Sequence, residues 1–267
     1  MNVLQSLKCF YQNYTKRKGI IGHSYLNSPI YYFEVFKMAY PTIIFAYGIH
    51  AREYVTTYLA MEQIKHFEKF GKVGRVFFIP AVNPDGINIS LTSFPLYKAN
   101  ARGVDLNVNF DALWGSGSQN VFSSGRENYV GKCPFSEIES KSLACFTLDI
   151  KPDVTVSYHS KGEEIYWDFH QKGEFAKQCY QLAKVVKGLT GYKIKSGLAS
   201  AGGYKDWCVK RLKIPALTIE VGRDNLTHPI GQKFLKSIFR KNQWVVNALT
   251  EQLYEKQIHK NCNKTSL

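Results

Sequence analysis

A histidine and a glutamate three residues apart are the first side chains in this sequence that could bind a metal ion. They are His50 and Glu53, and they follow the apolar run Ile43-Ile-Phe-Ala-Tyr, which ends at Gly48. Imidazole nitrogen and carboxylate oxygen suit zinc, and a catalytic zinc keeps one position open for water. Because seven histidines occur in 267 residues, such a pair also arises by chance. The interpretation therefore depends on a third ligand and a base.

A second histidine supplies the third ligand. The run 153–159 is largely apolar and ends at His159, much as the first run ends just before His50. Sites in open α/β sheets lie beyond the carboxyl ends of the strands, so the two histidines can meet there. With Glu53 they form a His-Glu-His set suited to zinc. Taken alone, His159 would be interpreted as a buried core histidine.

Two carboxylates complete the candidate site. Glu220 lies in the apolar run 216–221, where an ionised carboxylate is costly to bury without a partner. Beside a zinc ion it can take the proton of the attacking water and return it to the leaving amine. The alternative role for Glu220 is a structural salt bridge. Asp105 is a candidate to accept the free N–H of a ligand imidazole and so fix its tautomer.

Hydrophobic periodicity predicts one α/β domain, residues 1–267, that positions these side chains. We expect a mixed, doubly wound β-sheet with helices on both faces. The expected strands are 30–36, 43–48, 75–80, 153–159, 164–169 and 216–221. The expected helices are 1–18, 54–70, 136–148, 174–189, 204–212 and 231–256, followed by a flexible tail over 257–267.

The long stretch 83–134 lacks periodicity and is rich in Asn, Gly, Ser and Asp. Loops of this length in a compact domain are usually functional. Asn83-Pro-Asp-Gly86 is expected to form a plain turn. Ser136 and Glu139 have the spacing of a capping box, which predicts the start of the helix over 136–148.

Composition limits the partners and the location. The formal charge of +14 suggests either an anionic partner or a lysine-rich surface that keeps the protein soluble, and the second is favoured. No RNA-binding or zinc-finger pattern supports a nucleic-acid partner, and no apolar run of about 18 residues spans a membrane. Six scattered cysteines favour reduced thiols, with Cys145, Cys179 and Cys208 expected to be buried. With no signal-peptide pattern, the expected location is the cytoplasm.

The ordered motifs together resemble the zinc carboxypeptidase family typified by the pancreatic enzymes. The resemblance covers roughly residues 20–255 and rests on H-x-x-E at 50–53, N-P-D-G at 83–86, R-G-V-D-x-N at 102–107, Tyr-His-Ser at 158–160 and T-I-E at 218–220. It implies one zinc ion per chain. The residue roles it implies are zinc ligation by His50, Glu53 and His159, catalysis by Glu220 as the base, and further catalytic roles for Arg52 and Lys98. In the family a cation at the place of Lys98 polarises the scissile carbonyl.

Two positions depart from that family. Its members usually carry an Arg between two Asn, and this Arg binds the terminal carboxylate of the substrate. Here Val108 lies between Asn107 and Asn109. The digestive enzymes also carry a Tyr where Leu198 precedes the Ala-Gly-Gly segment.

Three other segments, 158–167, 201–207 and 220–223, resemble bacterial γ-D-glutamyl-meso-diaminopimelate peptidases. This resemblance implies a murein peptide substrate, handled in the cytoplasm or in a forespore. Asn107, Lys205 and Arg223 are the expected substrate contacts, and the alternative for Lys205 and Arg223 is a role as solvated surface charges. Three competing functions remain: a carboxypeptidase acting on ordinary peptides, a zinc-free domain that binds wall peptides, and a nucleic-acid binder.

Overall fold

The computed structural model describes residues 1–265, and within them eight strands form one mixed sheet. The strands are Lys18–His23 (β1), Pro29–Phe36 (β2), Thr42–Ala46 (β3), Arg75–Ile79 (β4), Val154–Ser160 (β5), Glu164–Tyr166 (β6), Lys193–Lys195 (β7) and Ala216–Val221 (β8). Their order across the sheet is β1-β2-β4-β3-β5-β8-β6-β7. The central strands β4, β3, β5 and β8 are parallel neighbours, whereas β2 and β6 join them antiparallel. This arrangement confirms the predicted α/β class.

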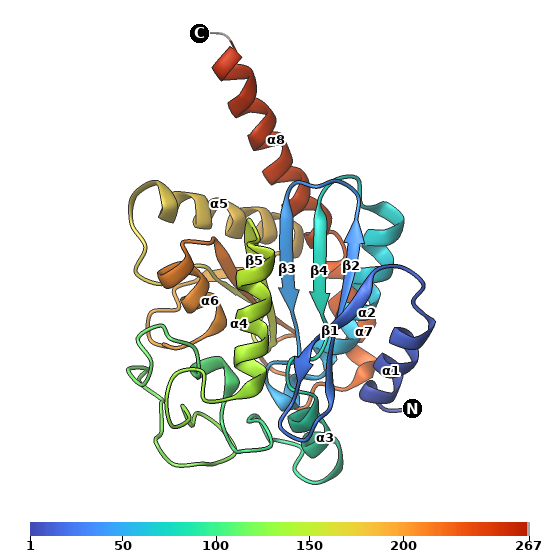
Figure 1. Cartoon of the computed structure of the whole chain (residues 1–267), viewed down its shortest axis with the longest axis vertical. Helices are drawn as coiled ribbons and strands as arrows, with labels where there is room; N and C mark the ends of the chain where they lie inside the picture. The colour runs from blue at the N-terminus through green and yellow to red at the C-terminus, as the bar shows by residue number, and fades with distance from the viewer. Residues whose placement is uncertain (266–267) are drawn as a thin grey trace.

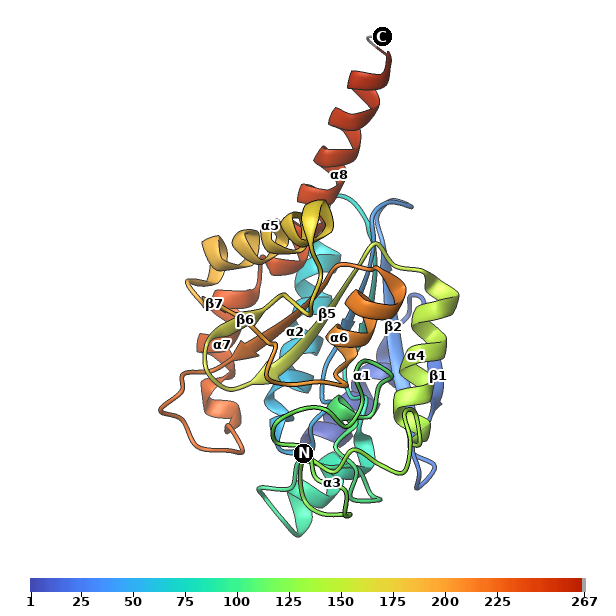
Figure 2. The ribbon, with the colours of Figure 1, turned by 90° about the vertical axis from the view of Figure 1, so that its left-hand side faces the viewer.

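Helices cover both faces of the sheet, as Figures 1 and 2 show. They are Val3–Asn13 (α1), Val55–Phe70 (α2), Pro84–Thr92 (α3), Ile138–Ile150 (α4), Gly173–Thr190 (α5), Tyr204–Trp207 (α6), Leu235–Asn242 (α7) and Val245–Thr265 (α8). Residues of α1, α2, α5, α7 and α8 share one hydrophobic core with the sheet, and residues of α4 and α6 share the other. The sheet is therefore the middle of three layers, and the carboxyl ends of its parallel strands lie between the two layers of helices.

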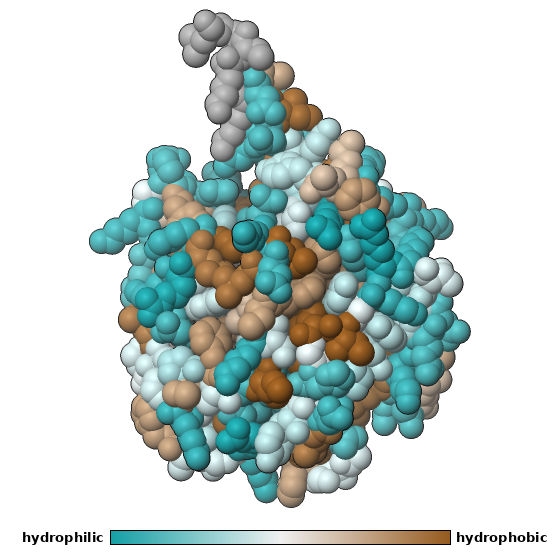
Figure 3. All heavy atoms as spheres, in the orientation of Figure 1, coloured by the Kyte–Doolittle hydropathy of each residue, from teal (hydrophilic) through white to brown (hydrophobic). Residues whose placement is uncertain are grey.

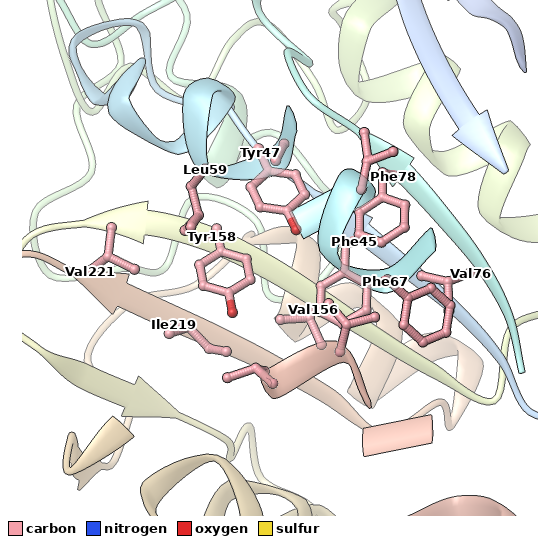
Figure 4. Packing of buried hydrophobic residues seen from close by; sticks show 14 of the residues in the cluster. Phe45, Tyr47, Leu59, Phe67, Val76, Phe78, Val156, Tyr158, Ile219 and Val221 are labelled. Carbon is pink, nitrogen blue, oxygen red and sulfur yellow. The ribbon is translucent and has the colours of Figure 1, made fainter. Parts of the chain in front are cut away.

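Stacked aromatic rings pack β3 against its two neighbours, β5 and β4, in the first of these cores (Figure 4). The rings of Tyr47 and Tyr158 lie 5.0 Å apart and almost parallel, and Phe45 stacks on Phe78 at 5.6 Å. Gln63 of α2 satisfies both buried phenols, because it accepts from Tyr47 Oη at 2.6 Å and donates to Tyr158 Oη at 3.2 Å. Each aromatic pair contributes about 0.5–1.5 kcal/mol beyond its buried area. This packing holds rigidly the two strands that lead to His50 and His159.

The first predicted helix is shorter than expected. It ends at Asn13, and residues from Lys18 form the edge strand β1, which pairs with β2. The Lys18 ammonium donates to the carbonyl oxygens of Tyr11 and Tyr14, each at 2.6 Å, so a basic side chain caps the end of α1.

Two helix starts also differ from prediction. Asn83 begins α3 rather than a plain turn: its Oδ1 accepts from Gly86 N at 3.0 Å, and Pro84 takes the first helical position. The capping box predicted at Ser136 does not form, because α4 begins at Ile138 and Ser136 Oγ donates to the Glu137 carboxylate.

The C-terminal helix predicted over 231–256 is two helices, α7 and α8, separated at residues 243–244. The tail predicted over 257–267 is helical as far as Thr265, and residues 266–267 lie outside the described residues. In Figure 1 the end of α8 projects away from the rest of the protein. The short edge strand β7 was missed, because three residues are too few to show an alternating pattern.

The surface mixes polar and apolar side chains. In the view of Figure 3, hydrophobic residues gather near the middle of the face and hydrophilic ones surround them. Cys179 and Cys208 are buried as predicted, but Cys145 is exposed, because it lies on the outer side of α4. None of the helices in residues 1–265 combines the length and apolar composition that a membrane crossing requires.

Candidate metal centre and active site

The three predicted ligands converge at the carboxyl ends of two neighbouring strands. His50 follows β3, Glu53 ends the 3₁₀ helix Ala51–Glu53, and His159 lies in β5. All three are buried, and their ligand atoms lie within 4.8 Å of one another. The Glu53 carboxylate is 2.8 Å from His50 Nδ1 and 3.0 Å from His159 Nδ1, and the two Nδ1 atoms are 3.1 Å apart.

The hydrogen bonds of His50 suit it to a metal ion. Its Nε2 lies 3.1 Å from Asp105 Oδ1, and an ionised carboxylate can only accept a hydrogen bond. The proton of neutral His50 is therefore on Nε2, so the lone pair of Nδ1 faces His159 and Glu53. Zinc–nitrogen bonds of about 2.0–2.1 Å in tetrahedral geometry place two ligand nitrogens about 3.3 Å apart. The observed separation of 3.1 Å fits a zinc ion between them.

Asp105 links this centre to a cation. Its Oδ2 lies 2.7 Å from Lys98 Nζ, which also donates to Asn128 Oδ1 at 3.2 Å. Burial opposes the charged form of Asp105, but Lys98 and His50 outweigh it and hold the pKa of this carboxyl well below its usual range. Asp105 is thus ionised at neutral pH, as its predicted partnership with a ligand imidazole requires.

Glu220 lies beside His159, its partner in the parallel pairing of β5 with β8. The side chain reaches the cavity described below, and its Oε2 is buried with no hydrogen-bond partner. Burial raises the pKa of Glu220 well above its usual range, and the Glu53 carboxylate raises it further. A cation bound at the three ligands would act in the opposite direction. A carboxylate in this position is suited to exchange protons with a ligand at the metal.

A cavity of about 380 Å³ opens next to the centre, and both His50 and Glu220 line it. Lys98, Asn107 and Lys205, three residues singled out from the sequence, also line it. Val108 lines the cavity too, and Gly202 packs directly against its backbone: a Cβ on Gly202, whose φ is +86°, would lie 2.7 Å from Val108 O. An apolar valine thus occupies the position in the cavity where the family usually carries the carboxylate-binding arginine.

Lys205 is a buried ammonium in this cavity. Its Nζ lies 2.6 Å from Asp206 Oδ1 and 2.6 Å from the backbone oxygen of Asp168. The second oxygen of Asp206 accepts from Gly203 N at 3.0 Å. Because an ammonium has three donors, Lys205 keeps one for a ligand. The interpretation of Lys205 as a solvated surface charge is wrong, since only 6% of its surface is exposed.

Two other expected residues lie outside the cavity. Arg52 donates from its guanidinium to Leu96 O at 3.2 Å and to Glu127 Oε2 at 3.1 Å. Arg223 lines a separate cavity of about 440 Å³ together with Glu163 and Lys241. The resemblance implies a catalytic role for Arg52, whereas Arg223 was expected to contact the substrate because it lies three residues past Glu220. The backbone turns at Gly222, where φ is +81°, and Arg223 lines the separate cavity.

Sequence reasoning missed His228. Burial lowers the pKa of its imidazole, and the charge of Glu53 acts on it through space in the opposite direction. Its Nδ1 is buried without a hydrogen-bond partner. No spacing motif marks this histidine, because it lies in the irregular segment between β8 and α7.

Comparison with known proteins agrees with this geometry. The family described as zinc carboxypeptidase matches residues 2–243. Gamma-D-glutamyl-L-diamino acid endopeptidase 1 of Lysinibacillus sphaericus is 27% identical over 175 residues, which cover 58% of this chain and 44% of that protein. The chain thus spans less than half the length of this relative.

Solved structures share the fold. Bovine thrombin-activatable fibrinolysis inhibitor, in complex with tick carboxypeptidase inhibitor, superposes with a TM-score of 0.80 at 20% identity, covering 95% of this chain and 96% of that one. Murein-tripeptide amidase MpaA from Escherichia coli O157 gives a TM-score of 0.64 at 21% identity, covering 91% and 95%. At these identities the likeness supports the architecture alone.

Proposed function

The chain belongs to the zinc carboxypeptidase family, and from this membership we propose that it hydrolyses the γ-D-glutamyl–meso-diaminopimelate bond of peptidoglycan stem peptides. It is a zinc-dependent metallopeptidase, so the proposal concerns its substrate and the roles of its residues. Two similar proteins, an endopeptidase acting on γ-D-glutamyl-L-diamino acid bonds and a murein-tripeptide amidase, support a murein peptide as the substrate.

In this proposal His50, Glu53 and His159 hold the zinc ion. When bound, zinc lowers the pKa of a water molecule and polarises a carbonyl oxygen. Glu220 takes the proton of the attacking water and passes it to the leaving amine. Lys98 lines the same cavity, and its ammonium stabilises the negative charge that develops on the scissile oxygen.

The Lys205–Asp206 pair is the observation that carries the choice of substrate. A general carboxypeptidase holds the terminal carboxylate with a guanidinium, because a planar bidentate pair gives energy and direction; Val108 cannot do this. Meso-diaminopimelate carries a second amine and a second carboxylate at the end of its side chain. The buried ammonium of Lys205 and the adjacent Asp206 carboxylate, 2.6 Å apart, complement that zwitterion. The side-chain amide of Asn107, which also lines the cavity, is available to the backbone of the diaminopimelate residue.

A comparison of substrates tests the proposal. The zinc-loaded protein is given L-Ala-γ-D-Glu-meso-diaminopimelate or hippuryl-Phe and hippuryl-Arg, and the products are identified by mass spectrometry. We expect release of diaminopimelate with a much higher kcat/KM than release of Phe or Arg. Equal or faster cleavage of the hippuryl dipeptides would support instead a carboxypeptidase acting on ordinary peptides. If zinc is bound but neither substrate is cut, both peptidase hypotheses fail, and the chain would be interpreted as a domain that only binds wall peptides.

A further inference from the structure

A groove at the edge of the sheet has no part in the proposed function. It has a volume of about 780 Å³ and is lined by the segment 191–196, which contains β7, together with side chains from α5. β7 is the last strand in the order of the sheet, and α5 lies next to it (Figure 2). Ligand sites in proteins usually occupy about 300–1,000 Å³, so the groove is large enough to bind a small molecule or a short peptide.

The groove meets the active-site cavity at Ser196, which lines both of them. The consecutive residues Tyr166 and Trp167 lie on the two sides of this boundary, because Tyr166 lines the cavity and Trp167 lines the groove. Hydrogen bonds fix the boundary: Ser196 Oγ donates to Asp168 Oδ2 and Gly197 N donates to Asp168 Oδ1, each at 2.8 Å. A ligand that fills the cavity can therefore continue past Ser196 into the groove.

Lys205 lies at the same boundary. Its Nζ donates to Asp168 O at 2.6 Å, and a Cβ added to Gly197 would lie 3.4 Å from that nitrogen. In the proposed function, Lys205 and Asp206 bind the distal carboxylate and the distal amine of diaminopimelate. The distal end of the released residue is therefore next to the groove, and a substituent on its amine would extend into the groove. An acylated amine keeps one N–H, which can still donate to the Asp206 carboxylate.

Three lysines give the groove a positive charge. Lys187 and Lys193 form no ion pair with any side chain that the structure describes, and Lys195 lies 3.6 Å from the Glu164 carboxylate. Lys195 is opposite Tyr166 in the pairing of β6 with β7, so both side chains lie on the same face of the sheet. The positive charge thus continues directly from the wall of the cavity, and the groove favours an anionic ligand.

Two aromatic rings form an apolar wall of the groove. The rings of Trp167 and Tyr180 lie 4.9 Å apart at an angle of 58°, and 39% of Tyr180 is exposed. Exposed aromatic surface gains free energy when an apolar group covers it. A simple anion such as phosphate would contact the lysines but not the rings. A short acidic peptide matches both features, because its methyl and methylene groups can cover the rings while its carboxylates pair with the lysines.

We propose that the groove binds an acidic peptide joined to the distal amine of the diaminopimelate residue that is released. This inference rests on the proposed function. In cross-linked peptidoglycan, a D-alanine of a second stem peptide acylates this amine, and the second peptide carries free carboxylates. The protein therefore hydrolyses branched stem peptides as well as linear ones. Lys205 holds the distal carboxylate, and Lys187 and Lys193 hold the branch.

Two branched substrates that differ by one carboxylate test the inference. Both are L-Ala-γ-D-Glu-meso-diaminopimelate acylated at the distal amine, one with N-acetyl-D-Glu-D-Ala and the other with N-acetyl-D-Gln-D-Ala. We expect the zinc-loaded protein to cut both and to favour the acidic branch about 3–10-fold in kcat/KM, the range for a few exposed ion pairs. The difference should lie in KM, because the groove is remote from the scissile carbonyl, and it should shrink at high salt.

Substitutions in the groove test which residues hold the branch. The double variant Lys187→Gln, Lys193→Gln should lose the preference and cut the unbranched tripeptide as fast as the unmodified protein does. Lys132→Gln, Lys236→Gln is the matched control, because it removes the same charge from two exposed lysines outside the groove, and it should keep the preference. Tyr180→Ser should raise KM about 3-fold or more for both branched substrates and spare the tripeptide. Thermal melting of each variant shows whether it is folded.

The outcomes separate this inference from the proposed function. If the tripeptide is cut and the branched substrates are not, the groove is no peptide site, and the proposed function stands. If the two branches are cut equally well, or if the double variant keeps the preference, the lysines do not hold the branch and only protect the exposed edge of the sheet. If no murein substrate is cut while hippuryl dipeptides are, the proposed function fails and this inference with it.

Discussion

Replacing Asp105 with asparagine would remove one charge and leave the size of the side chain unchanged. The carboxylate is fully buried and accepts from His50 Nε2 at 3.1 Å, Asn107 N at 3.0 Å and Asn128 N at 3.3 Å. It also pairs with Lys98 at 2.7 Å. An amide in its place can still accept with its oxygen, but it no longer balances the Lys98 charge.

The expected loss concerns the metal. A neutral amide accepts from His50 Nε2 more weakly than a carboxylate does, so it holds the proton there less firmly and Nδ1 is a poorer ligand. Loss of such a partner usually weakens metal affinity about 10–100-fold, which corresponds to about 1.4–2.8 kcal/mol. The contact with His50 is 3.1 Å long rather than short, so we expect a value near the lower end of the range for Asp105→Asn. Asp105→Ala should lie near the upper end, because it also removes the oxygen atom that accepts from His50 Nε2.

Competition with a chromophoric zinc chelator measures this affinity directly. Asp111→Asn is the matched control, because Asp111 forms only a surface ion pair with Arg211, with 43% and 52% of the side chains exposed. The control should keep the affinity of the unmodified protein. Far-UV circular dichroism verifies that each variant is folded. If folded Asp105→Asn binds zinc as tightly as the control, Asp105 does not act on the metal through His50 and only shapes its loop.

Four further outcomes are expected. His159→Ala should lose stoichiometric zinc and activity, measured by metal analysis of the purified protein; retention of both would remove His159 from the ligand set. Glu220→Gln should keep zinc while kcat falls at least about 10²–10⁴-fold, and near-normal turnover would place the base elsewhere. Lys205→Met should reduce kcat/KM for the murein tripeptide and spare hippuryl-Phe, whereas Lys184→Met at an exposed position should change neither. Phe45→Ala should lower the free energy of unfolding by about 3–5 kcal/mol in urea titration, and a loss below about 1 kcal/mol would contradict the tight packing of its stacked ring.

The sequence predicted the strands and the metal ligands because both depend on local patterns. The sequence runs that form β3, β5 and β8 are apolar and long enough to identify. Each of them contains or precedes a residue that can bind a metal ion or exchange a proton. His50, Glu53 and His159 are brought together because parallel strands end at the same edge, a rule that needs no further information.

The errors have the opposite origin. Asn83 begins a helix because its side chain accepts a hydrogen bond from Gly86 N. The Asn-Pro-Asp-Gly composition is typical of turns and does not reveal this contact. Glu139 was assigned to a capping box, but its carboxylate instead accepts from Tyr25 N and Asn100 Nδ2 across the fold. His228, whose Nδ1 is buried, lies in a long irregular segment where no motif marks it. In each case the local structure depends on a contact with a residue distant in the chain, or on a backbone geometry that the composition does not specify.

Different parts of the chain determine the stability of the fold and the selectivity for the substrate. The rings of Tyr47 and Tyr158 stack in the core just before the two ligand histidines, so the packing of that core restricts the movement of the ligands. Lys205, the cation assigned to substrate recognition, lines the cavity and lies outside that core, so a change of its charge leaves the packing of β3 against β5 intact. Substitutions in the core should therefore alter stability and metal binding together. Substitutions at Lys205 should change which peptide is cut while zinc affinity stays the same, because Lys205 hydrogen-bonds to Asp206 and to the backbone of Asp168 rather than to a metal ligand.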